Sequence, residues 1–124
     1  MKTKNNWLLF LLLTLLFTLP AVFSLLYHPF FTFHDETQIV NMHQFFKTLD
    51  LGQFPPRWGL DFHFNYGSPF PAFYYQLAYF LGYPFHLAGF SLVATFKILL
   101  ILGFFVAALG VYFLGLQLTT PFLS

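Results

Sequence analysis

Charged side chains are missing from three long stretches of this sequence, and their placement constrains the fold more than any other feature. No charged residue lies between Lys4 and Asp35, between Asp61 and Lys97, or after Lys97. Only 7% of the 124 residues are charged, whereas a soluble domain carries about 25%. So few charges cannot solvate a globular surface, and they include no Lys/Arg cluster for nucleic acid. The sequence therefore predicts a membrane protein and excludes a soluble domain, a charged disordered tail and a nucleic-acid binder.

Two stretches are long and apolar enough to cross a membrane as helices. Residues 7–27 are almost wholly apolar, and about 20 helical residues span the hydrocarbon core of a bilayer. Residues 97–118 carry no charge after Lys97, which we place at the membrane interface. A cleaved signal peptide is the alternative for the first stretch, with residues 1–6 as its basic head. The apolar run continues past the candidate cleavage site, which favours a membrane anchor.

Residues 28–96 connect the two predicted spans as a long loop, which begins with an amphipathic pattern. In residues 36–51 apolar side chains recur at helical spacing, polar side chains fill the other faces, and Gly52 follows. This pattern predicts an amphipathic helix over 36–51. The apolar positions are Ile39, Met42, Phe46 and Leu49.

An aromatic segment lies later in the same loop. Residues 72–81 contain no Pro or Gly and are rich in Tyr and Phe. Ten residues are too few to span a bilayer, and aromatic rings favour the lipid headgroup level, so we expect an interfacial helix here. A third span near residues 67–90 is the alternative, but it would leave almost no residues for a turn before Lys97.

These patterns together predict an all-α integral membrane protein with two transmembrane helices and two juxtamembrane helices in the loop between them. The basic residues Lys2 and Lys4 place the head at 1–6 in the cytoplasm. Residues 28–96 would then lie outside, and residues 97–118 would return the chain to the cytoplasm.

An acidic pair stands just beyond the first predicted span. Asp35 and Glu36 follow His34 at the expected membrane surface, where they could meet a lipid headgroup. Asp35 also fits the N-cap of the helix that follows, with Gln38 three residues on, as in a capping box. The spacing alone favours the cap, and the position at the membrane favours a functional role.

Arg57 and Asp61 are the other charged candidates for a site. Arg57 is the chain's single arginine and could grip a phosphate with two parallel hydrogen bonds. The alternative is an ion pair with Asp50 or Asp61 and stacking on Trp58. We assign no metal site.

Metal binding and several kinds of catalytic motif find little support in the sequence. A metal site built from His34, Asp35, His43 and His63 has unconvincing spacing, because His34 and His43 do not share a helix face. The chain has no cysteine, and it shows no phosphate-binding glycine loop, serine elbow or zinc-protease pattern.

Several motifs of the loop resemble a known family. They are residues 55–58 (Pro-Pro-Arg-Trp), 65–69 (Asn-Tyr-Gly-Ser-Pro) and 73–75 (Phe-Tyr-Tyr), placed after a first span and the pair Asp35–Glu36. In this order they resemble the front of bacterial membrane proteins described as 6-pyruvoyl-tetrahydropterin synthase-related. Those proteins in turn look like members of the GT-C glycosyltransferase superfamily.

The resemblance implies a site and a reaction. Asp35 would match the catalytic carboxylate of GT-C enzymes, and Glu36 the second acid of the pair. Asp35 would act as a general base on an acceptor hydroxyl while a sugar leaves a polyprenyl phosphate. We add Arg57, His34 and Asp61 as candidate phosphate or substrate contacts, and a divalent cation as a candidate aid to the leaving phosphate. The expected location is the bacterial cytoplasmic membrane.

Length distinguishes this chain from the family, whose members have many spans. We therefore expect an N-terminal portion, with residues 119–124 as a truncated end, whose partners are the bilayer and the missing C-terminal spans. Such a portion would be inactive alone. The alternative is a small non-catalytic membrane protein, or a piece of a transporter or scaffold, in which Asp35 only caps a helix.

Overall fold

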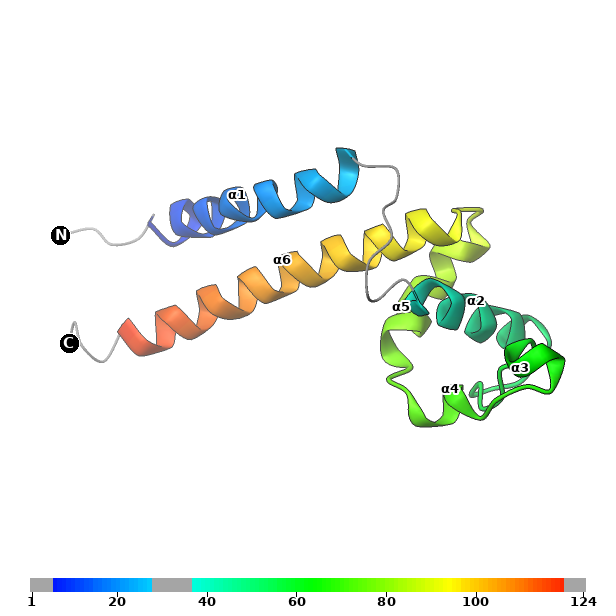
Figure 1. The fold of residues 1–124 in the computed structure, drawn as a ribbon. Helices are drawn as coiled ribbons and strands as arrows, with labels where there is room; N and C mark the ends of the chain where they lie inside the picture. The colour runs from blue at the N-terminus through cyan, green and yellow to red at the C-terminus, as the bar shows by residue number, and fades with distance from the viewer. Residues whose placement is uncertain (1–5, 28–36, 120–124) are drawn as a thin grey trace. The chain divides into compact units, whose positions relative to one another are not determined.

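The computed structural model describes residues 6–27 and 37–119 of the chain. Within these ranges the secondary structure is helical, apart from one antiparallel bridge between Gly59 and Ser68 (Figure 1). This confirms the all-helical class for the described residues. The helices are α1 (Asn6–Tyr27), α2 (Thr37–Asp50), α3 (Phe62–Asn65), α4 (Phe70–Phe73), α5 (Leu77–Leu87) and α6 (Leu92–Thr119).

The chain divides into two compact units, which share α6. Unit 1 comprises Met1–Pro29 and Leu100–Ser124, so it contains α1 and the longer, C-terminal part of α6. Unit 2 comprises Phe30–Leu99 and contains α2 to α5 with the first turns of α6.

Both α1 and α6 are long and apolar enough to cross a membrane. The qualifying segments are Trp7–Tyr27 and Leu92–Gln117, each with a mean hydropathy of 2.5. At 1.5 Å per residue, helices of 22 and 28 residues are about 33 and 42 Å long, which exceeds the hydrocarbon core. Their large apolar side chains are mostly exposed, with Phe17 at 79% and Val111 at 70%. Such surfaces suit hydrocarbon better than water.

Two threonine hydroxyls of α1 are satisfied within the helix, and one of its carbonyls accepts from α6. The hydroxyl of Thr14 donates to the Phe10 carbonyl at 2.8 Å, and that of Thr18 donates to the Leu15 carbonyl at 2.6 Å. Tyr112 on α6 donates its hydroxyl to the Trp7 carbonyl at 2.9 Å. These bonds leave the hydroxyls partnered without water, as a hydrocarbon environment requires.

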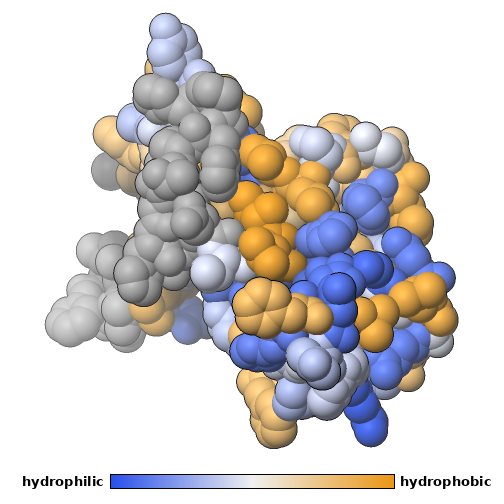
Figure 2. All heavy atoms as spheres, turned by 45° about the vertical axis from the view of Figure 1, so that its right-hand side comes forward, coloured by the Kyte–Doolittle hydropathy of each residue, from blue (hydrophilic) through white to orange (hydrophobic). Residues whose placement is uncertain are grey.

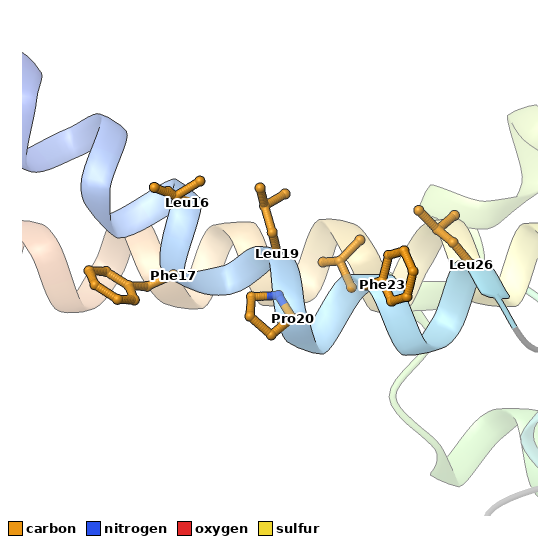
Figure 3. Close-up of a pocket in the computed structure, with 7 residues that line it drawn as sticks. Leu16, Phe17, Leu19, Pro20, Phe23 and Leu26 are labelled. Atoms are coloured by element: carbon orange, nitrogen blue, oxygen red, sulfur yellow. The ribbon is translucent and has the colours of Figure 1, made fainter.

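A shallow apolar hollow lies along α1 beside Pro20. Pro20 has no N–H for the carbonyl four residues before it, and prolines within helices commonly cause a kink. The side chains around the hollow are hydrocarbon, including Leu16, Phe17 and Phe23 (Figure 3). The hollow therefore offers van der Waals contact and no polar group to a ligand.

The second apolar helix begins earlier than the sequence predicted. We expected a start at Lys97, but α6 begins at Leu92. Ser91 explains the difference, because its hydroxyl accepts from the Ala94 N–H at 3.2 Å and its carbonyl accepts from the Thr95 N–H at 2.8 Å. Ser91 thus caps the helix, and Lys97 lies in its second turn instead of marking its start.

Unit 2 has an aromatic core between α2 and α5. The fully enclosed side chains are Met42, Phe45 and Phe46 from α2 and Tyr79 from α5. Phe45 contacts the ring of Tyr79 with centroids 5.3 Å apart, a spacing favoured by aromatic pairs. The amphipathic helix predicted over 36–51 corresponds to α2, and its apolar face packs on α5.

The polar face of α2 is also covered, which the amphipathic pattern did not predict. Asn41, Gln44 and Thr48 are buried as well as the apolar residues. Thr48 donates to the Gln44 carbonyl at 2.7 Å and to the Trp58 carbonyl at 3.1 Å. The polar face is covered because it binds the segment that follows α2.

The interfacial helix predicted over residues 72–81 is wrong in its bounds. Tyr74 is extended, with φ −107° and ψ 160°, and it ends α4 at Phe73. The next helix, α5, runs through Gly82 and Pro84, which we had taken as helix breakers. Glycine fits at position 82 of α5 because three side chains pack closely on it, and a Cβ atom there would come within 3.4 Å of each. They are Phe46, Thr95 and Leu99.

Candidate functional site

Four hydrogen-bonded side chains gather at the N-terminal end of α2. Gln38, in the first turn of α2, donates its amide to the hydroxyls of Tyr74 at 2.6 Å and Tyr75 at 3.3 Å. Tyr79, in the first turn of α5, donates its hydroxyl to Gln38 Oε1 at 2.6 Å. Tyr75 donates in turn to the Tyr74 hydroxyl at 3.0 Å. We call these four residues the tyrosine cluster.

The bend between α4 and α5 positions two members of the tyrosine cluster. The extended backbone at Tyr74 turns the chain so that neighbouring tyrosines, Tyr74 and Tyr75, both reach Gln38. Their rings contact one another with centroids 4.1 Å apart. A continuous helix would have separated adjacent side chains by about 100° of rotation. The break in the predicted helix therefore creates the cluster.

Burial differs strongly across the tyrosine cluster. Tyr79 is 4% exposed, and this burial raises the pKa of its hydroxyl well above the ordinary value, with Tyr74 and Tyr75 adding to the shift. The Tyr79 hydroxyl is therefore neutral at physiological pH and remains a donor. Tyr75 is 62% exposed and presents its ring and hydroxyl at the surface. The cluster thus joins a buried anchor to an accessible aromatic face.

Such an arrangement suits a ligand that carries hydroxyl groups. Phenol hydroxyls donate and accept hydrogen bonds, and the Gln38 amide does both. The rings add apolar faces that can stack on a flat, partly apolar ligand. A sugar combines these properties.

The predicted acids directly precede α2 in the sequence. His34, Asp35 and Glu36 are outside the residues that the structure describes, so the capping and catalytic interpretations of Asp35 both stay predictions. Gln38 follows Asp35 by three positions in the sequence and is in the first turn of α2. In sequence, the acidic pair therefore immediately precedes the helix end that carries the tyrosine cluster.

Asp61 lies elsewhere, bound to the later half of α2. Its carboxylate accepts from Lys47 at 2.7 Å and from the Gln44 amide at 2.8 Å, and its backbone N–H donates to Gln44 Oε1 at 3.0 Å. The hydrogen bonds from Gln44 and Lys47 lower the pKa of Asp61. Six residues separate Gln38 from Gln44, or about 9 Å along the helix. Asp61 thus fastens the loop to α2 and is not part of the tyrosine cluster.

Arg57 is exposed, and its predicted ion pairs are absent from the described residues. Asp61 pairs with Lys47 at 2.7 Å, and Asp50 accepts from the Tyr83 hydroxyl at 2.6 Å. The Arg57 side chain forms no ion pair with either acid, so the ion-pair part of our alternative explanation for this residue is wrong. Its backbone N–H donates to Gln53 Oε1 at 3.0 Å.

One hydrogen-bond donor ties the Arg57 segment to the tyrosine cluster. The Gln76 amide donates to the carbonyls of Pro56 at 2.9 Å and Pro71 at 2.5 Å. Pro56 directly precedes Arg57, and Tyr75 directly precedes Gln76. The structure therefore brings the Pro-Pro-Arg-Trp segment beside the bend that carries Tyr74 and Tyr75.

Sequence reasoning missed the tyrosine cluster. We interpreted the tyrosines as a lipid-interface belt and Gln38 as part of a capping box with Asp35. Gln38 and Gln76 were a possible signal, because they are uncharged polar residues near helix ends whose amides can join separate segments. The pairings join residues 36 to 41 positions apart, and helical periodicity carries no information over that range.

A metal centre is not found in the part of the chain described. Within residues 6–27 and 37–119, no group of three or more His, Cys, Asp or Glu side chains could hold an ion. His34 and Asp35, two of the residues considered for such a site, fall outside these ranges.

Comparison of the chain with protein-family models, curated proteins and solved structures finds no match. The functional interpretation therefore rests on the motifs of the sequence and the geometry of unit 2.

Proposed function

We propose that this chain supplies the outer catalytic loop of a GT-C type glycosyltransferase that takes a sugar from a polyprenyl phosphate. Asp35 is the proposed general base, and Glu36 assists it. The observation that carries the proposal is the tyrosine cluster at the helix end that follows these acids, because it offers hydroxyls, an amide and an exposed ring to a sugar.

The chemistry assigns a role to each group. A carboxylate at Asp35 would take the proton of the acceptor hydroxyl as that oxygen attacks the anomeric carbon. The bond between that carbon and the phosphate oxygen breaks, and the phosphate leaves with the electron pair. Arg57, whose guanidinium has no ion-pair partner among the described residues, would bind the leaving phosphate in bidentate fashion. Gln38 and Tyr75 would hold the sugar.

The proposed setting is the bacterial cytoplasmic membrane, with α1 and α6 crossing it. Their mean hydropathy and exposed apolar side chains support this location. The basic head supports a cytoplasmic N-terminus with residues 28–96 outside.

Transfer from a labelled polyprenyl-phosphate mannose or glucose tests this function in membranes that contain the complete reading frame. We expect Asp35→Asn to lower transfer at least about 100-fold, because general-base catalysis contributes about 10²–10⁴. Asp50→Asn is the matched control, since Asp50 is a carboxylate of unit 2 held by Tyr83. It should retain transfer.

The same substitution separates the function from the non-catalytic alternative. Asn is a competent helix cap, so Asp35→Asn preserves any capping role. Full transfer by Asp35→Asn, with normal amounts of protein in the membrane, would show that Asp35 is only a cap and would overturn the proposal.

A further inference from the structure

Residues 59–68 form a closed loop in unit 2, which we call the 59–68 loop. Its ends are paired, with the Gly59 N–H donating to the Ser68 carbonyl at 2.8 Å and the Ser68 N–H donating to the Gly59 carbonyl at 2.9 Å. The Gly67 N–H donates to the Phe62 carbonyl at 2.8 Å and closes a smaller ring inside. The loop contains α3 and lies close to the later half of α2 (Figure 1).

Side-chain contacts hold this loop firmly to the rest of unit 2. Lys47 and Gln44 bind Asp61 from α2. Gly67, with φ +81°, packs so closely on Trp58 that a Cβ atom there would overlap the indole ring. Loops closed by their own packing and hydrogen bonds keep a defined shape, so the 59–68 loop is a rigid projection.

The tip of the loop has an unfavourable backbone. His63, Phe64 and Asn65 have φ values of 52°, 58° and 71°, so three successive residues with side chains are left-handed. Such residues cost free energy relative to right-handed ones and persist only where the surroundings impose them. Strain of this kind is concentrated at functional positions.

The strained tip displays its aromatic residues to the outside. Phe64 is 97% exposed and Tyr66 is 85% exposed. Phe62 instead turns inward, and its ring centroid lies 5.8 Å from that of Phe70. Hydrophobic residues likewise stand among hydrophilic ones on the face of the molecule shown in Figure 2. A freely moving loop could fold Phe64 inward, but this loop is held open.

The connections of unit 2 identify the surface that such a tip would meet. Unit 2 starts three positions after Tyr27, the end of α1, and it ends at Leu99 within α6. With α1 and α6 in the membrane, as proposed, unit 2 is joined to a membrane-spanning helix at each of its ends. Residues 62–70 contain no Asp, Glu, Lys or Arg, so their entry into the headgroup region does not require the dehydration of a charged carboxylate, ammonium or guanidinium group. Phe and Tyr are suited to that region.

We infer that the 59–68 loop is a wedge that inserts Phe64 into the headgroup region of the membrane. The inference rests on the membrane location in the proposed function and is independent of glycosyl transfer. It assigns unit 2 a second attachment to lipid besides the two apolar helices.

Spin labels attached at single cysteines test the wedge, since the chain has no cysteine of its own. The full chain in phosphatidylcholine nanodiscs would carry a label at Phe64→Cys or, as a second probe of the same loop, Tyr66→Cys. His43→Cys is the control, because His43 is an exposed polar residue on α2. Val106→Cys, at a position 68% exposed on α6, reports whether that helix lies in the bilayer. Collision with oxygen and with a water-soluble nickel chelate gives the depth of each label.

The inference expects the labels at 64 and 66 to collide at least about threefold less with nickel than the label at 43 does, while they retain oxygen collisions. Equal nickel collisions at 43 and 64 would overturn it. Loss of both oxygen and nickel collisions at 64 would also overturn it, because that result indicates contact with protein. A water-exposed label at 106 would refute the membrane location itself. None of these readouts depends on transfer activity, so failure of the catalytic proposal stays distinguishable.

Discussion

Removing one hydroxyl from the tyrosine cluster should loosen the packing of α2 on α5. In Tyr79→Phe the ring and its contact with Phe45 are retained, and the hydroxyl's 2.6 Å hydrogen bond to Gln38 Oε1 is lost together with its interaction with Asn41. Gln38 is partly buried, so its oxygen would lack that donor in a position where water replaces it poorly. A buried polar group that loses its partner costs about 1–3 kcal/mol. We expect about 1–2 kcal/mol here, because Gln38 keeps its bonds to Tyr74 and Tyr75.

Hydrogen exchange measured by mass spectrometry on the full chain in nanodiscs gives the free energy of local opening for α2 and α5 separately. A loss of about 1–2 kcal/mol makes exchange about 5- to 30-fold faster in peptides that open with this contact. Peptides from α1 should be unaffected. Tyr75→Phe is the matched control, since Tyr75 is exposed and its hydroxyl accepts from Gln38 at the longer distance of 3.3 Å, and it should change exchange less than about threefold.

The opposite pattern would refute the reasoning. If Tyr79→Phe exchanged at the wild-type rate, the hydrogen bond to Gln38 would contribute nothing to the association of α2 with α5. If Tyr75→Phe had the larger effect, the exposed part of the tyrosine cluster would be its structural anchor, and the assignment of Tyr75 to ligand binding would fail.

Three further predictions concern pH, the 59–68 loop and Arg57. Because burial raises the pKa of Tyr79, folding gains a contribution that is complete below the ordinary pKa of about 10 and is lost as the pH rises toward the higher folded value. Thermal unfolding followed by circular dichroism should therefore show a steeper loss of stability above about pH 10 for the wild type than for Tyr79→Phe, and parallel curves would contradict the assignment. Gly67→Ala should open the 59–68 loop by about 1–3 kcal/mol, because Ala is strained at φ +81° and would overlap Trp58, and faster exchange confined to that loop would be the sign. Arg57→Gln should weaken binding of a polyprenyl-phosphate sugar to nanodiscs about 10-fold or more while exchange throughout unit 2 stays unchanged, since Arg57 has no ion pair among the described residues. Unchanged binding would remove Arg57 from the proposed site.

The sequence predicted the features that depend on local pattern. Uninterrupted apolar runs foretold α1 and most of α6, and the recurrence of Met42 and Phe46 foretold the buried face of α2. These predictions succeed because burial of a helix face or a whole helix leaves a periodic or continuous apolar signal. The start of α6 was predicted at Lys97, which we placed at the membrane interface. Ser91 is an ordinary helix cap, but we did not use it as a signal.

The features that were missed depend on contacts between distant segments. Gly82 breaks an isolated helix, yet it is the residue that lets α5 approach Phe46 and Leu99 closely, and only the neighbours reveal that preference. The hydrogen bonds of Asp61 were also not predicted, because its partners Gln44 and Lys47 lie on a helix 14 to 17 positions earlier.

A few polar residues, chiefly two glutamines of α2, organise unit 2. Its core is aromatic and non-directional, so rings alone would allow several packings of α2 on α5. Gln38 binds three tyrosines from other segments, Gln44 forms two hydrogen bonds with Asp61, and both amides require particular geometries. Gln38 fixes the bend at Tyr74 and Tyr75, and Gln44 fixes the start of the 59–68 loop at Asp61. The surface proposed to bind sugar and the surface proposed to enter lipid are therefore set by two glutamines on one helix, and exchanging either for Leu should disturb one surface and spare the other.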